Sequence, residues 1–132
     1  MKKVLHILAA TAAIFTGTVA NAQYIMHVAG ANKPGHTGDE GPARYALLRS
    51  PSDICKDKQK NLYIADGGPM GYVNDACIRR IDAITGVITT VAGVINVPDS
   101  PGNTADNISA LAAKLGGCAA ICFDTAQNLL IA

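Results

Sequence analysis

The sequence lacks the signatures of several common functional classes. It contains no P-loop, no Ser-His-Asp spacing and no CxxC pattern, and its glycine-rich stretch 67–71 lacks the lysine of a phosphate loop. No hydrophobic run after Ala22 is long enough to span a bilayer. We therefore assign no catalytic residue, no cofactor-binding residue and no metal ligand from the sequence, and we expect no cofactor.

Clustered positive charge is also missing. Without the two lysines of segment 1–22, nine basic residues face ten acidic ones, which gives a formal charge of −1. A nucleic-acid or anionic-membrane partner would require a clustered basic face, so neither partner is expected. The alternation of Lys56, Lys58 and Lys60 instead predicts the solvent side of a strand and turn.

Segment 1–22 has the three parts of a secretory signal peptide. Two lysines precede a short apolar run, Val4 to Phe15, and Ala20-Asn21-Ala22 supplies the small residues for cleavage. The run is shorter than the roughly 20 residues of a membrane-spanning helix, and no cysteine follows for lipid attachment. We expect cleavage after Ala22 and a secreted or periplasmic protein without a membrane span.

An internal repeat follows the signal peptide. Val28-Ala29-Gly30 recurs as Val91-Ala92-Gly93, and Pro34-Gly35 recurs as Pro101-Gly102 after a four-residue insertion between Val94 and Ser100. We call the spacing of the second match, from Pro34 to Pro101, the repeat offset. Further pairs at the repeat offset are Thr37 and Thr104, Asp39 and Asp106, Ala43 and Ala110, Ala46 and Ala113, Leu48 and Leu115, and Asp57 and Asp124. So many matches in one register indicate a duplicated structural unit.

Each repeat is predicted to form four short antiparallel strands, because runs of β-formers alternate with turn residues. In the first repeat they are expected at Asp53 to Asp57, Leu62 to Asp66, Cys77 to Asp82 and Val87 to Ala92. Four antiparallel strands make the blade of a β-propeller, and neighbouring blades must cover its two faces. The predicted fold is therefore an all-β propeller, incomplete in this chain.

Segments outside these strands complete the expected organisation. Tyr24 to Ala29 matches the fourth strand of the repeat and is expected to be a lone outer strand, of the kind that closes a propeller ring. Pro42 to Arg49 and Ser109 to Leu115 are each predicted to form a short helix between blades. The expected division is a signal peptide (1–22) and a partial propeller (23–132), comprising the lone strand (23–30), a first repeat (31–93) and a truncated second repeat (94–132).

Four motifs of the first repeat resemble those of bacterial NHL-repeat propellers. Residues 37–43 resemble GDGGPA, residues 61–66 resemble GNLYIAD, residues 78–82 resemble IRKVD, and residues 85–93 resemble TGxITTVAG. Glu40, Lys60 and Cys77 depart from the family pattern, and the resemblance weakens after Gly93. The resemblance implies a propeller that acts in binding, although a few relatives, such as peptide-amidating lyases, are enzymes with metal-binding histidines.

The candidate ligands give no clear site. His27 and His36, the only histidines after the signal peptide, lack the clustered spacing of a metal site. The repeated acids (Asp39, Asp106, Asp57 and Asp124) are expected to hold loops and turns through hydrogen bonds to the backbone, because calcium would need more oxygens from one loop.

Four cysteines, Cys55, Cys77, Cys118 and Cys122, are present, and export would permit disulfides. Cys55 and Cys77 are expected to lie two strand spacings apart, roughly 9 to 10 Å, which exceeds the limit of about 7 Å for a bridge. Cys55 and Cys122 occupy equivalent positions in neighbouring blades and are also expected to be too far apart. A turn could bring Cys118 and Cys122 together, but buried free thiols are the favoured interpretation.

Three functions are compatible with this sequence. The first is an exported scaffold that binds a protein, peptide or glycan through loops on one face. The second is an enzyme of the lyase or lactonase type whose catalytic residues lie in further blades, and the third is a structural repeat of a larger surface protein. The repeat pattern without a catalytic cluster favours the non-enzymatic scaffold.

Overall fold

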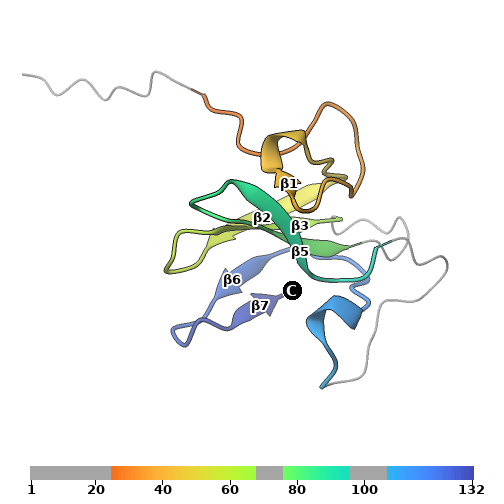
Figure 1. Ribbon diagram of the computed structural model, residues 1–132. Coiled ribbons are helices and arrows are strands. Elements are labelled where there is room, and N and C mark those ends of the chain that lie inside the picture. Colours follow the sequence, from red (N-terminus) through yellow and green to blue (C-terminus); the bar gives the residue numbers. More distant parts are fainter. Residues whose placement is uncertain (1–24, 68–75, 96–106) are drawn as a thin grey trace, which may run out of the picture.

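The computed structural model describes residues 25–67, 76–95 and 107–132 (Figure 1). The predicted signal peptide, most of the loop after residue 67, and Asp106 lie outside the described residues. The described residues form β-strands and two 3-10 turns, without an α-helix. The expected all-β class is therefore confirmed. None of the described helical segments is long and apolar enough to cross a membrane.

One antiparallel sheet contains the strands of the first repeat. Its order is β1 (Gly41–Pro42), β5 (Val87–Ala92), β4 (Cys77–Ile81), β3 (Leu62–Asp66) and β2 (Pro51–Lys56). The predicted bounds of β3 and β5 are confirmed, whereas β2 begins two residues earlier than expected, and β2 and β4 each end one residue earlier. Strands β2 to β5 are thus a meander in which each strand pairs with the next.

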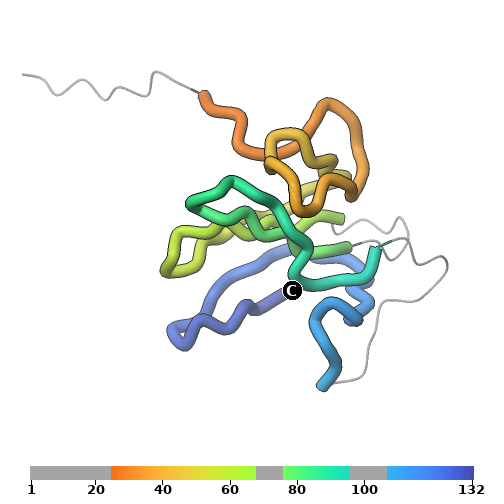
Figure 2. Tube along the Cα trace, viewed as in Figure 1, coloured from red at the N-terminus to blue at the C-terminus, as the bar shows by residue number. Residues whose placement is uncertain are grey.

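The second repeat forms a smaller sheet from β6 (Ile121–Phe123) and β7 (Leu129–Ile131). These strands reproduce β2 and β3 of the first repeat, because Cys55 pairs with Tyr63, and Cys122 pairs with Leu130 at the repeat offset. Figure 2 shows this second hairpin beside the larger sheet. The repeat seen in the sequence is therefore a repeat of backbone structure.

The turns repeat as closely as the strands. In each copy an aspartate accepts hydrogen bonds from the asparagine four residues later: the Asn61 N–H lies 2.8 Å from Asp57 Oδ1, and the Asn128 N–H lies 2.7 Å from Asp124 Oδ1. The residue before each asparagine is left-handed, with φ values of 70° at Lys60 and 68° at Gln127. The expectation that Asp57 and Asp124 hold turns is confirmed.

Apolar residues pack on both faces of the larger sheet. One face packs Ala65, Ile78 and Ala92 against Ile121 and Cys118 of the second repeat. On the opposite face Ile64, Ile81 and Ile88 pack against Ala43 and Ala46 from the loop before β2. Because alternate residues of a strand point to opposite faces, Ile64 and Ala65 fall in different clusters.

The predicted short helices are wrong. Residues Ala43–Tyr45 and Ala110–Ala112 each form a single 3-10 turn, η1 and η2. The helix cannot continue because Ala46 has extended backbone (ψ 148°), and its carbonyl accepts the Ala31 N–H at 2.7 Å. The equivalent Ala113 carbonyl accepts the Val94 N–H at 3.0 Å. Pairing with the preceding loop therefore replaces helical hydrogen bonds in both copies.

The lone strand expected over Tyr24 to Ala29 is also absent from its described part, residues 25–29. Ile25 is fully exposed, and no described strand pairs with this segment. A single strand without a partner leaves its backbone groups unpaired, so the segment stays irregular until Gly30, whose N–H donates to the Ala43 carbonyl at 3.1 Å.

Candidate functional site

Three side chains with metal-ligating atoms meet at one end of the larger sheet. Asp66 ends β3 and pairs with Cys77, the first residue of β4, and His36 reaches both from the loop before β1. His36 Nδ1 lies 3.1 Å from Asp66 Oδ2 and 3.7 Å from Cys77 Sγ. All three residues are buried. We call them the His36–Asp66–Cys77 cluster.

Backbone donors fix the carboxylate of this cluster. The Arg49 N–H lies 2.9 Å from Asp66 Oδ1 and 3.1 Å from Oδ2, and the Ser50 N–H lies 2.8 Å from Oδ1. Asp66 is fully buried, so these bonds replace the water that a carboxylate would otherwise need. His36 Nε2, in contrast, is buried without a hydrogen-bond partner among the described residues.

A buried arginine holds the loop before β1 onto β4. Arg79 is fully buried, and its Nη2 donates to Asp39 Oδ1 at 2.5 Å. Asp39 Oδ2 also accepts the Thr90 N–H at 3.0 Å. Asp39 therefore holds its loop by side-chain hydrogen bonds, as expected, although the arginine partner was not anticipated.

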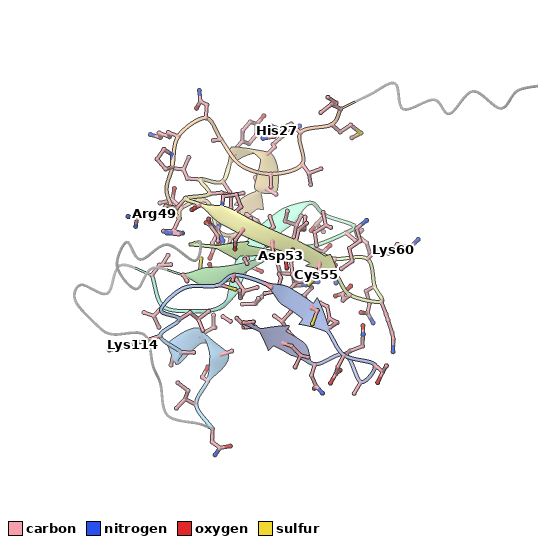
Figure 3. All side chains as sticks on the ribbon, turned by 180° about the vertical axis from the view of Figure 1, so that it is seen from behind. His27, Arg49, Asp53, Cys55, Lys60 and Lys114 are labelled. Atoms are coloured by element: carbon pink, nitrogen blue, oxygen red, sulfur yellow. The ribbon has the colours of Figure 1, made fainter. Side chains whose placement is uncertain are left out.

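The other charged candidates lie apart from the cluster. His27 is exposed on the N-terminal segment, and Lys60 is exposed on the turn after β2 (Figure 3). Lys56 and Lys58 are also exposed on β2 and its turn, as predicted. Lys58 also links the repeats: its N–H donates to Gln127 Oε1 at 2.9 Å, and Nζ donates to the Thr125 carbonyl at 3.1 Å.

The four cysteines all lie among the described residues and form no disulfide with one another, as favoured from the sequence. The expectation that all are buried is wrong: Cys77 and Cys118 are buried, Cys55 is half-buried and Cys122 is exposed. Cys122 lies on the face of β6 that the first repeat does not cover, because Ile121 takes the inward position. Burial raises the pKa of the Cys55 and Cys118 thiols.

The turns carry carboxylates with lowered pKa values. Backbone hydrogen bonds from Thr85 and Ile84 lower the pKa of Asp82 from 3.8 to about 2. Hydrogen bonds from the Asn128 side chain and backbone lower the pKa of Asp124. Desolvation opposes the shift at Asp57, but hydrogen bonds from Asn61 outweigh it and lower that pKa too.

These shifts predict an acid-sensitive fold. A carboxylate whose folded pKa lies below its unfolded value stabilises the fold above the unfolded value, and this contribution is lost as pH falls through the folded value. For Asp82 that window runs from 3.8 down to about 2. Urea midpoints measured across the window should fall with pH, and Asp82→Asn should flatten the dependence. An unchanged slope in this variant would contradict the assignment.

An open apolar groove lies on the face of the sheet opposite the second repeat. Its volume is about 620 Å³, and its walls include the N-terminal segment 25–29, Leu48, and Ile54, Leu62 and Ile64 of β2 and β3. Ile54 is 57% exposed there. An exposed isoleucine in the middle of a strand marks a face that is only partly covered.

Sequence reasoning missed the His36–Asp66–Cys77 cluster because its members come from three segments. The hairpin of β3 and β4 brings Asp66 opposite Cys77, and their places at the end of one strand and the start of the next could have indicated this. The position of His36 depends on the path of the 30–41 loop, for which the sequence carries no comparable signal.

Comparison with solved structures places this chain beside part of a longer protein. No family model matches this chain, and no curated protein matches it. A crystal structure of a structural genomics protein of unknown function from Bacteroides thetaiotaomicron is similar, with a TM-score of 0.58 and 28% sequence identity. The match covers 79% of this chain and 23% of that chain, so this chain spans about a quarter of its length.

Proposed function

We propose that the chain provides one complete blade and part of the next blade of an exported NHL-type β-propeller, which acts as a scaffold for binding a protein, peptide or glycan. The observation that carries this proposal is the recurrence of strand pairs and turn hydrogen bonds at the repeat offset.

The contacts between the repeats support stacked blades. Ile121 N–H donates to Asp53 Oδ2 at 2.8 Å, and the Ser52 hydroxyl donates to the Cys118 carbonyl at 2.6 Å (Figure 3 labels Asp53 on β2). Tyr63 and Phe123 add an edge-to-face ring contact, with centroids 4.8 Å apart. The second hairpin is thereby docked on the first sheet by both polar and apolar contacts.

The same packing would cover the apolar groove. Ile54 and Ile121 are equivalent in the repeat, yet Ile121 is 5% exposed and Ile54 is 57% exposed. Ile121 is buried because it faces a neighbouring sheet. A preceding blade would bury Ile54 in the same way, as expected for a ring of repeats in which each blade covers the next.

One end of the sheets offers a surface for binding. The turns at 57–61, 82–86 and 124–128 gather at the same end (Figure 1). Carboxylate hydrogen bonds brace each turn, which limits the ordering cost of binding. The tip of the middle turn exposes Ile84 almost completely, at 95%, and an exposed aliphatic side chain on a braced turn is suited to contact a ligand.

The test begins with the chain expressed from its own Met1 in a bacterium. We expect protein outside the cytoplasm that starts at Gln23, and a block of cleavage by Ala22→Arg. Purified protein is then applied to peptide and glycan arrays, where Ile84→Ser should weaken binding at least tenfold. Leu111→Ser, which replaces another exposed aliphatic residue, is the control. Cytoplasmic retention, absence of binding on both arrays, or equal binding by both variants would contradict the proposal.

A further inference from the structure

We propose that the His36–Asp66–Cys77 cluster binds a divalent transition metal ion of the zinc class. Its ligands would be His36 Nδ1, Asp66 Oδ2 and Cys77 Sγ, since the ligand atoms of the three residues lie within 4.8 Å of one another. This site goes beyond the proposed scaffold function, because it does not depend on further blades or on a ligand at the turns.

The distances between the three atoms suit a tetrahedral ion. Zinc binds cysteine sulfur at about 2.3 Å and histidine nitrogen at about 2.0 to 2.1 Å, so two such ligands at a tetrahedral angle lie roughly 3.5 Å apart. Here the sulfur and nitrogen of Cys77 and His36 are 3.7 Å apart, and the nitrogen and oxygen of His36 and Asp66 are 3.1 Å apart. Small side-chain movements would therefore admit an ion.

The chemistry of the ligand set selects the metal. A thiolate, an imidazole and a carboxylate favour zinc and similar transition metals, whereas magnesium and calcium favour sites built from oxygen alone. Three protein ligands leave a fourth position for water or another small donor, as in sites with an open coordination position.

The surroundings of Asp66 orient it for this role. The N–H groups of Arg49 and Ser50 hold its carboxylate while Oδ2 contacts His36. Outer-shell hydrogen bonds of this kind fix ligand orientation in metal sites. Both donors are backbone groups, so the anchoring of Asp66 is built into the fold.

Metal binding would change the protonation state of Cys77 and the tautomer of His36. The Cys77 thiol would lose its proton to solvent, and His36 would place its proton on Nε2, leaving the Nδ1 lone pair for the ion. Without an ion, Nδ1–H can donate to Asp66 instead, which leaves Nε2 as the buried atom without a partner among the described residues. The metal-bound state therefore differs from the metal-free state by one released proton and by a thiolate at Cys77. Each of these two differences can be measured.

Cobalt(II) titration of the full chain tests the proposal. Chelator-treated protein should bind one cobalt ion per chain, with the near-ultraviolet charge-transfer absorption of a thiolate ligand. Cys77→Ser should abolish this absorption, and His36→Gln should weaken cobalt binding at least tenfold. Cys118→Ser removes another fully buried thiol and should leave the absorption unchanged.

Circular dichroism of each variant shows whether the fold is retained. If Cys77→Ser does not fold, the weaker cobalt binding expected of His36→Gln, a substitution in a loop, tests the proposal instead. Absence of the thiolate absorption in the unmodified chain would overturn the proposal and leave the cluster as a hydrogen-bonded group. Persistence of the absorption in Cys77→Ser, or its loss in Cys118→Ser, would overturn it by assigning the metal to another cysteine.

Discussion

Gly93→Ala is expected to lower the free energy of unfolding by about 3 to 5 kcal/mol, combining left-handed strain with overpacking. Gly93 has φ 95°, and an added Cβ would collide with the Ala76 carbonyl oxygen and lie 2.7 Å from Cys77 Cα. Both atoms belong to the backbone that leads into β4, so neither can move without disturbing the strand. Urea unfolding followed by circular dichroism would measure the loss.

Alanine substitutions at two other glycines distinguish the cost of backbone strain from the cost of steric crowding. Gly30 occupies the equivalent place in the repeat with the same φ of 95°, but its added Cβ would meet only the Leu48 side chain, with Cδ1 nearest at 3.4 Å. Gly86 has φ 68° with nothing within 4 Å. Alanine at either position should lower the free energy of unfolding by about 1 to 2 kcal/mol, from backbone strain alone. Equal losses at Gly30 and Gly93 would show that crowding at Ala76 is unimportant.

This comparison also shows how far a repeat in sequence predicts a repeat in environment. Gly30 and Gly93 share their backbone conformation, which the Val-Ala-Gly pattern could predict. Their surroundings differ because Gly93 approaches the start of β4, whereas Gly30 faces a leucine side chain. Local conformation follows from local sequence, but packing depends on which segment the fold brings alongside.

The strands were predictable because their signals are local. Strands β3 and β5 contain β-branched residues and are flanked by turn residues, and their predicted ends match the structure. The helices failed for the converse reason. Alanines and leucines after Pro42 have helical spacing, but the Ala46 carbonyl pairs with Ala31 of the preceding loop, a contact that helix propensity does not encode.

Burial of polar side chains was the least predictable feature. Arg79 and Arg80 are adjacent on β4, yet Arg79 is fully buried and Arg80 is partly exposed. Alternation requires that the two face opposite ways, but it does not say which face the structure covers. Asp66 was predicted as the end of a strand, and only its backbone donors and His36 show why a charged group is buried there.

Asp39→Ala is expected to lower the free energy of unfolding by about 2 to 4 kcal/mol, because it leaves the buried Arg79 guanidinium without its carboxylate. The loss of stability should lie near the lower end of this range, since the Asp39 side chain is itself 38% exposed. Glu40→Gln alters the adjacent exposed acid and should change stability by less than about 0.5 kcal/mol. The urea midpoints of both variants, measured with the unmodified chain, check these values.

Arg79→Met in the Asp39→Ala background decides whether the cost comes from the unpaired charge. If it does, the second substitution should recover part of the loss, because methionine can occupy the buried position without needing a partner. The Thr90 N–H would still lack its acceptor on Asp39, so recovery should be incomplete. Two substitutions whose costs simply add would mean that Asp39 and Arg79 act independently, despite their 2.5 Å contact.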